Sequence, residues 1–234
     1  MPSRSKKTLL LALAGNAAAQ YSVRFGPYYS LGATTSYIVE AETTLYPGKT
    51  PDPQQDRMVL WPGMGTSNGQ LVQSIVSSST ETEAQCGGSS GQWCVFASTY
   101  TGETQISGDA KPMSANQGVT INYKYDEASG NYTQTVSIEG QVVSTLSTAS
   151  GKAQGWGTAV ECQDECSGIV NAHTYQNTTI KLAAADSAFK GTLALNEATA
   201  TELTSPDGGI TWTVDKISIA QSSFTPVSSS NARV

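Results

Sequence analysis

Residues 35–45 read TSYIVEAETTL, and this stretch decides the fold class. Its apolar and polar side chains alternate, which places Tyr37, Val39, Ala41 and Leu45 on one face and Glu40, Glu42 and Thr44 on the other. Alternation with a period of two is typical of a β-strand that buries one face and exposes the other. We therefore expect a half-buried strand here, with Glu40 and Glu42 on its solvated face rather than acting as a catalytic carboxylate pair.

The same period continues along the rest of the chain. Further strands are predicted at residues 57–61, 70–77, 93–101, 119–125, 132–139, 141–148, 157–162, 178–182 and 210–220. Turn residues separate these segments, and the Glu139-Gly140 pair predicts a tight hairpin. Only residues 183–189 and 196–202 have a helix-like composition. The sequence predicts an all-β fold, an antiparallel β-sandwich or jelly roll with roughly ten short strands and minimal helix, in one domain over residues 20–234.

Composition excludes several protein classes. Of the 234 residues, 14% are charged, against about 25% in an average soluble domain, and 38% are hydrophobic. So few charges argue against a coiled coil. The four Trp, ten Tyr and four Phe supply enough apolar surface to argue against a disordered chain.

Residues 1–19, MPSRSKKTLLLALAGNAAA, have the pattern of a secretory signal peptide. Three basic residues precede a short apolar run, and alanines at positions 17–19 provide the small residues of a cleavage site. The run is far shorter than the roughly 20 residues of a membrane span, so we expect no membrane insertion. Cleavage would remove three basic residues and change the formal charge from −6 to −9, which disfavours binding to nucleic acid. The predicted location is outside the cell or in the lumen of the secretory pathway.

Four cysteines fit such an oxidising compartment. Three pairings are possible, and we favour Cys86 with Cys94 and Cys162 with Cys166 because each pair closes a short loop. The spacings match no common zinc finger, and His173 is the only histidine, so no metal site is expected. Asn131 and Asn177 begin the sequons NYT and NTT, which predict N-glycans on exposed segments.

Residues for nucleophilic catalysis are scarce. The sequence has no G-x-S-x-G motif, and a lone His173 among turn residues is more often structural than catalytic. Asp164 and Glu165, between two cysteines, are open to calcium binding or to simple solvation, and we favour solvation.

Four segments carry a family resemblance: LWPGM at 60–64, SNGQLVQSI at 67–75, GQWCV at 91–95 and ECQDEC at 161–166. They resemble small secreted ascomycete proteins with a concanavalin-like β-sandwich, over most of residues 35–220. The chain also resembles the intermolecular hetero-Diels–Alderases of tropolone–sesquiterpenoid biosynthetic clusters. The resemblance implies a fungal source and an enzyme without a cofactor, which joins a quinone methide to a macrocyclic terpene such as humulene. It carries over no catalytic motif.

Candidate site residues therefore come from this sequence alone. A cycloaddition needs a dry cavity for two apolar substrates and hydrogen-bond donors at the heterodiene oxygen. The candidate substrate-binding residues are Trp61, Met64, Gln92, Trp93, Tyr123 and Trp156. The candidate catalytic donors are Asn68, Gln73 and His173. Two alternatives stay open, because Trp61 could plug one end of the sandwich and Tyr123 could fill the core.

Two other functions compete with the cycloaddition. One is a secreted protein that binds carbohydrate or cleaves polysaccharide, and the other is a non-enzymatic effector or wall protein. A closed apolar pocket favours the Diels–Alderase, whereas a polar concave face favours a protein that binds carbohydrate or cleaves polysaccharide. A molecule without a cavity of ligand size favours the non-enzymatic role.

Overall fold

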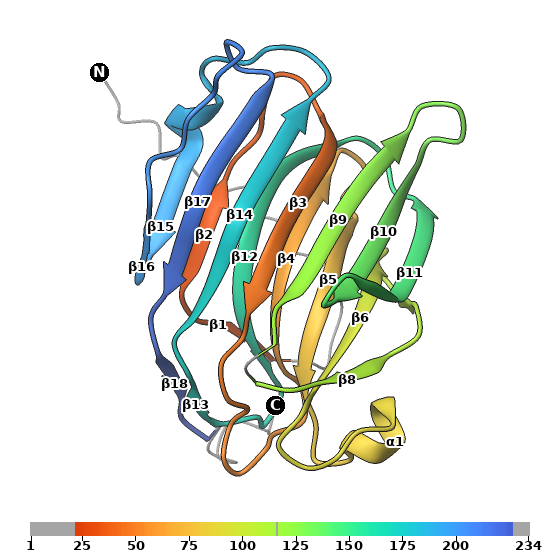
Figure 1. Cartoon of the computed structure of the whole chain (residues 1–234), viewed down its shortest axis with the longest axis vertical. Coiled ribbons are helices and arrows are strands. Elements are labelled where there is room, and N and C mark those ends of the chain that lie inside the picture. The colour runs from red at the N-terminus through yellow and green to blue at the C-terminus, as the bar shows by residue number, and fades with distance from the viewer. Residues whose placement is uncertain (1–21, 116, 227–234) are drawn as a thin grey trace, which may run out of the picture.

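The computed structural model describes residues 22–115 and 117–226, which form two stacked layers of antiparallel strands (Figure 1). The predicted signal peptide lies outside the described residues. The front layer has the order β16 (Ala198–Ala200), β17 (Thr211–Ile219), β14 (His173–Leu182), β3 (Ile38–Tyr46), β9 (Val119–Asp126), β10 (Asn131–Ile138) and β11 (Gln141–Ala149). The back layer has the order β15 (Leu193–Asn196), β2 (Tyr28–Leu31), β12 (Ala153–Gln163), β4 (Met58–Thr66), β5 (Leu71–Ser78), β6 (Trp93–Tyr100) and β7 (Gln105–Ser107). This arrangement confirms the predicted antiparallel β-sandwich.

Short strands complete the two layers. β1 (Val23–Phe25) pairs with β12, and β8 (Lys111–Met113) pairs with β6. β13 (Gly168–Val170) and β18 (Ser222–Phe224) form a separate two-stranded sheet. Within the described ranges, no helix combines the length and the hydrophobicity that a membrane span needs.

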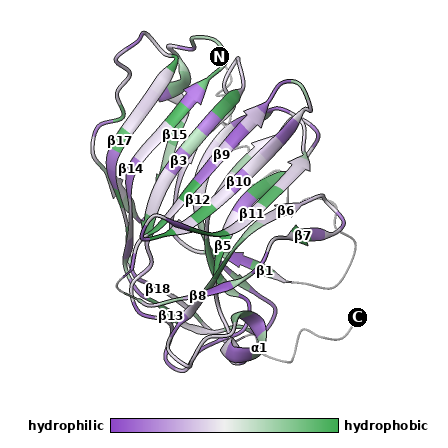
Figure 2. Cartoon of the chain, turned by 45° about the vertical axis from the view of Figure 1, so that its right-hand side comes forward, coloured by the Kyte–Doolittle hydropathy of each residue, from purple (hydrophilic) through white to green (hydrophobic). Residues whose placement is uncertain are grey.

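The core lies between the layers and consists mainly of aliphatic and aromatic side chains. Among its fully buried members are Leu31, Ile38, Leu60, Met64, Trp93, Tyr123 and Trp156. In Figure 2, hydrophobic and hydrophilic residues mix along the front strands, as expected for strands that turn one face inward and the other to solvent.

Two predictions for the front layer can be compared with the structure: the hairpin at Glu139-Gly140 and the alternation of buried and exposed residues in β3. The predicted hairpin is confirmed: Glu139 and Gly140 have φ angles of 51° and 79°, the left-handed pair of a type I′ turn, and they join β10 to β11. In β3, however, Ile38 is buried while Val39 is only half-buried. The register with β14 shifts between Lys181 and Leu182, and this irregularity moves the first apolar contact by one residue.

The two segments of helix-like composition do not form α-helices. Residues 183–189 form turns that lead into a 3-10 turn, Phe189–Thr192. Residues 196–202 contain β16, which pairs with β17, so sheet hydrogen bonds override the local composition. The α-helix that the described residues do contain, α1 (Thr82–Cys86), was not predicted.

Both predicted disulfides are confirmed. Cys86 is bonded to Cys94 and Cys162 to Cys166. Of the sequon asparagines, Asn131 opens β10 and is half-buried, whereas Asn177 is exposed at an irregularity of β14 with a φ of 53°.

Candidate functional site

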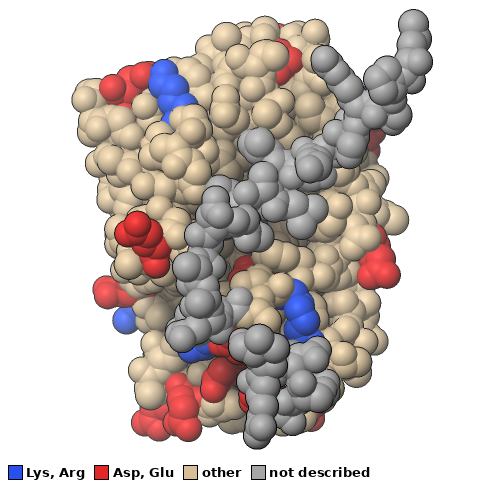
Figure 3. Space-filling model, turned by 180° about the vertical axis from the view of Figure 1, so that it is seen from behind, with Lys and Arg blue, Asp and Glu red and all other residues tan. Residues whose placement is uncertain are grey.

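The back layer carries apolar residues on both of its faces. Along β4, β5, β6 and β12, alternate residues point into the core between the layers, and the others form a second apolar cluster on the outer face. That cluster contains Val59, Trp61, Ile75, Phe96 and Ala159. Figure 3 views the molecule from this side; a group of acidic residues lies at its lower end, and further charged residues lie along both edges and at the upper end.

A groove of about 510 Å³ lies on this outer face. Val59, Trp61, Ile75 and Phe96 form its apolar part. Polar or charged residues are eleven of the sixteen that line it. The groove is therefore a polar site with an apolar floor, and its volume falls within the range of ligand-binding clefts.

Glu161 is the buried carboxylate of the groove, although it was not among the predicted site residues. Its Oε2 accepts a hydrogen bond of 2.7 Å from Trp61 Nε1, and its Oε1 accepts one of 2.6 Å from Gln163 Nε2. Burial raises the pKa of Glu161 above its ordinary value, and the hydrogen bonds from Gln163 and Trp61 oppose this only in part. Glu161 therefore keeps its proton to a higher pH than an exposed glutamate and can serve as an acid.

Trp61 and Gln73 are brought together through Gly63. A Cβ at Gly63 would lie 3.1 Å from Trp61 Cε3 and 3.2 Å from Gln73 Cβ, so only a glycine lets the indole lie this close to the strand. Gln73 is 6% exposed, and its Oε1 has no hydrogen-bond partner in the described structure. An acceptor left unsatisfied at such burial favours a ligand that carries an N–H or O–H donor.

The strand register separates Gln73 from Glu161. Gln73 pairs with Gly63, which pairs with Gly157, and Glu161 lies four residues further along β12. Four residues of strand span about 13 Å. Gln73 and Glu161 therefore occupy different parts of the groove, and the N–H of Trp61 points to the Glu161 part.

The predicted substrate-binding residues divide between the two faces. Only Trp61 lines the groove. Met64, Trp93, Tyr123 and Trp156 are fully buried in the core between the layers, on the opposite face of the sheet. Tyr123 donates to Pro62 O at 2.7 Å and accepts from Ser74 N at 2.8 Å, so its hydroxyl is satisfied within the protein. The structure thus places these four residues in the core and away from the groove, although they are predicted to line one cavity together with Trp61.

The predicted donors also separate. Gln73 lines the groove, but Asn68 lies in the turn between β4 and β5 and accepts a hydrogen bond of 2.6 Å from Thr66 Oγ1. Gln92 lies in the loop after α1, where its Oε1 accepts from Ser89 N. His173 is 3% exposed at the start of β14, Asn171 O lies 3.0 Å from its Nδ1, and burial lowers its pKa to about 4. Its imidazole is neutral at ordinary pH and lies outside the groove.

No family model matches the chain, and no curated protein matches it. Among solved structures, it is similar to scytalido-glutamic peptidase with a peptide-based transition state analogue: 10% identity, 84% of this chain and 99% of that chain covered, TM-score 0.51. A second structure of that peptidase, with a transition state analogue inhibitor, has 9% identity, the same coverage and a TM-score of 0.49. Peanut lectin with a nine-residue peptide has 8% identity, coverage of 90% and 94%, and a TM-score of 0.32. At these identities the likeness concerns the fold and no activity.

The resemblance to ascomycete Diels–Alderases stays a prediction.

Proposed function

We propose that this chain is a secreted hydrolase that binds an extended peptide in the outer-face groove and uses Glu161 as the acid that cleaves a peptide bond. The observation that carries the proposal is the buried Glu161, whose carboxyl accepts hydrogen bonds from Trp61 and Gln163 inside a polar groove and whose pKa is raised by burial. A carboxyl with a raised pKa beside bound substrate is a common form of general acid.

The groove suits a polymer with polar groups along its length better than an apolar small molecule. Its polar lining meets backbone N–H and C=O groups, and the unsatisfied Gln73 Oε1 accepts one such N–H. The fold is similar over nearly the full length of a glutamic peptidase whose structure holds a peptide-based analogue. Glycosidic cleavage usually needs two carboxylates, and because Asp56 and Glu81 share the lining with Glu161, a glycan is the alternative substrate that the test must distinguish.

The proposed reaction needs one water and no cofactor. Water adds to the carbonyl carbon of the bound peptide, and the C–N bond then breaks. The proton of Glu161 moves to the leaving nitrogen, while a proton from the water returns to the Glu161 carboxylate. Trp61 and Gln163 keep the carboxyl in place through both transfers.

The test is peptide cleavage by the purified, glycosylated protein across acid and neutral pH. Glu161→Gln should lower kcat/KM by at least about 100-fold, the usual contribution of a general acid. Activity should also fall as the pH rises through the raised pKa of Glu161, because the proton donor is lost.

Glu165→Gln is the matched control, because Glu165 is exposed and outside the groove lining. Undiminished cleavage by Glu161→Gln contradicts the proposal. Release of sugars from a polysaccharide, with peptides left intact, would assign the groove to a glycan instead.

A second candidate function is the cofactor-free hetero-Diels–Alderase of fungal secondary metabolism. The observation in its favour is the apolar cluster of Val59, Trp61, Ile75 and Phe96 next to Glu161, whose raised pKa favours the protonated form that can donate a hydrogen bond to a quinone methide oxygen. The polar majority of the lining speaks against it. The test is to incubate a quinone methide precursor with humulene. A faster or more stereoselective coupling that Trp61→Ala abolishes would favour this function over hydrolysis.

We also propose that the chain passes through the secretory pathway and carries N-glycans at Asn131 and Asn177. The two disulfides support an oxidising compartment. The exposed position of Asn177 supports its modification.

A further inference from the structure

One end of the groove is a wall built from α1 and the residues before it. Ser78 and Ser79 lead from β5 into the helix, and Glu81, Ala84 and Gln85 line the groove beside them. Apart from Ser78, the last residue of β5, the wall residues lie outside the back-layer strands, so their side chains can vary without disturbing the sheet.

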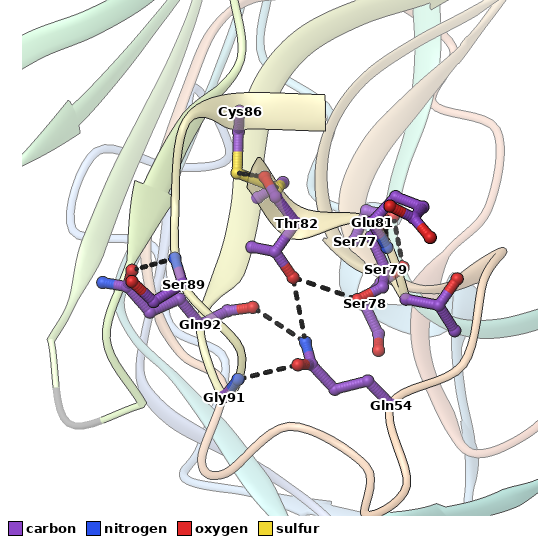
Figure 4. The surroundings of a disulfide bond; sticks show 12 residues. Gln54, Ser77, Ser78, Ser79, Glu81, Thr82, Cys86, Ser89, Gly91 and Gln92 are labelled. Carbon is purple, nitrogen blue, oxygen red and sulfur yellow. Dashed lines mark hydrogen bonds between the residues drawn. A yellow bond between two sulfur atoms is a disulfide. The ribbon is translucent and has the colours of Figure 1, made fainter. Parts of the chain in front are cut away.

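The wall is held firmly in place (Figure 4). The Cys86–Cys94 disulfide ties α1 to β6. Gln54 Oε1 accepts a hydrogen bond of 2.7 Å from Gly91 N, and Gln54 Nε2 donates one of 3.1 Å to Gln92 O. In Figure 4, Glu81 lies beside Ser77 and Ser79, on the other side of Thr82 from Gln92. These contacts anchor the end of α1 and the loop that follows it, and Glu81 precedes the helix as one of the residues that line the groove.

The charges at this end are mainly negative. Apart from Glu161, which the proposed function keeps as a proton donor, the acidic residues of the lining are Asp56 and Glu81, and Arg57 is its basic residue. Arg57 forms an ion pair with Asp164, which is outside the lining. The Thr80 backbone N–H holds the pKa of Asp56 below its usual value, so Asp56 keeps its charge to a lower pH than an exposed aspartate does. Glu81 is exposed, and no hydrogen bond or ion pair of its carboxylate is found in the described part of the chain.

A second observation, independent of these charges, points to a ligand in the same groove. Gln73 lines it further along β5, is 6% exposed, and leaves its Oε1 without a partner. A donor on the ligand would satisfy this acceptor. An extended ligand that reaches Gln73 at one point would meet the α1 wall at another, because Ser77 and Ser78 continue the same strand toward α1.

We propose that the α1 wall is a specificity subsite in which Glu81, with Asp56 beside it, takes a basic side chain of the bound peptide, a lysine or an arginine. The inference rests on the proposed function, because it takes the ligand to be a peptide. It adds that cleavage occurs at a fixed distance from a basic residue. A carboxylate at the edge of a groove recognises a cation mainly through electrostatic attraction, which salt weakens.

The test measures peptide binding to Glu161→Gln protein and cleavage by otherwise wild-type protein. The probes are matched peptides that differ only by Lys or Glu at one position, scanned along the sequence. At the position that meets the wall, the Lys peptide should bind and be cleaved about fivefold better, the effect of one exposed charge pair. Glu81→Lys should abolish or invert this preference, and Glu81→Gln should remove most of it.

Glu83→Lys is the matched control, because Glu83 is an exposed residue of the same helix outside the groove lining. Equal binding of Lys and Glu peptides, equal effects of the two lysine variants, or no peptide binding at all would overturn the subsite. Peptides that bind with the Lys preference but stay uncut would overturn the proposed hydrolysis and support the subsite. Peptides that are cut without a preference would overturn the subsite alone.

Discussion

Alternate residues of the same strands build the two faces of the back layer, yet one face is core and the other is a groove. Trp156 and Trp61 show the difference most clearly. Trp156 is fully buried between the layers, where its Nε1 has no partner in the described structure. Trp61 donates its N–H to Glu161 on the outer face. Similar apolar residues lie on both faces, so the carboxyl and amide side chains among them are what make the outer face a candidate site.

The largest expected effect comes from truncating the two tryptophans. Trp156→Ala leaves a cavity in the sealed core and should lower the free energy of unfolding by about 3–5 kcal/mol. Trp61→Ala should cost clearly less, because water from the groove can fill the space that the indole leaves. Urea denaturation of both variants measures the two losses. An equal loss for Trp61→Ala would mean that the outer face is a second core rather than a site.

Two of the buried titratable groups, His173 and Glu161, make stability depend on pH in opposite directions. Burial lowers the pKa of His173 from 6.5 to about 4, so the unfolded chain binds this proton more tightly than the folded one. The stability that neutral His173 contributes is complete above about pH 6.5 and declines as the pH falls toward 4, by about 3 kcal/mol in total.

His173→Gln should therefore lose less stability than wild type over this pH range. Denaturation curves of both proteins at several pH values give the difference directly, since the other titrating groups are common to both. A constant difference across the range would show that His173 titrates normally and is not buried as described.

Glu161 should have the smallest effect on stability, with the opposite sign. Its folded-state pKa is raised, so its contribution is complete below the unfolded-state value and is lost as the pH rises through the folded-state value. Glu161→Gln stays neutral and should gain stability relative to wild type from acid to neutral pH. The measurement is again chemical denaturation, with Glu165→Gln as the control that should show no such trend.

The fold class could be predicted from the sequence because the front layer is exposed on one side. In β3, Glu42 is exposed and Ala41 and Leu45 are buried, which gives a clear period of two. The helix at Thr82–Cys86 could not be predicted from the sequence, because five residues carry too little periodic signal. A disulfide at the end of the helix and a hydrogen bond from Gly91 to Gln54 in the loop after it hold this segment in place instead.

The site could be predicted only in part. The amide-rich segment at residues 60–73 predicts Trp61 and Gln73 as candidate site residues, and both line the groove. The sequence does not predict which face of the sheet each of them occupies. Every residue of β4 is buried, so apolar residues occupy both faces and alternation no longer distinguishes core from groove. For the same reason Glu161 gave no signal: its strand, β12, is buried at most positions, and only pairing with β4 places it beside Trp61.

The two sequons have a consequence for how the molecule would meet a large partner. Asn131 and Asn177 belong to β10 and β14, both in the front layer, whereas the groove lies on the outer face of the back layer. N-glycans at these positions would form a hydrated cover over one side and leave the other side bare. The glycosylated protein would then be two-sided, able to lie with its groove against a protein surface or a wall while its sugars face the surrounding fluid.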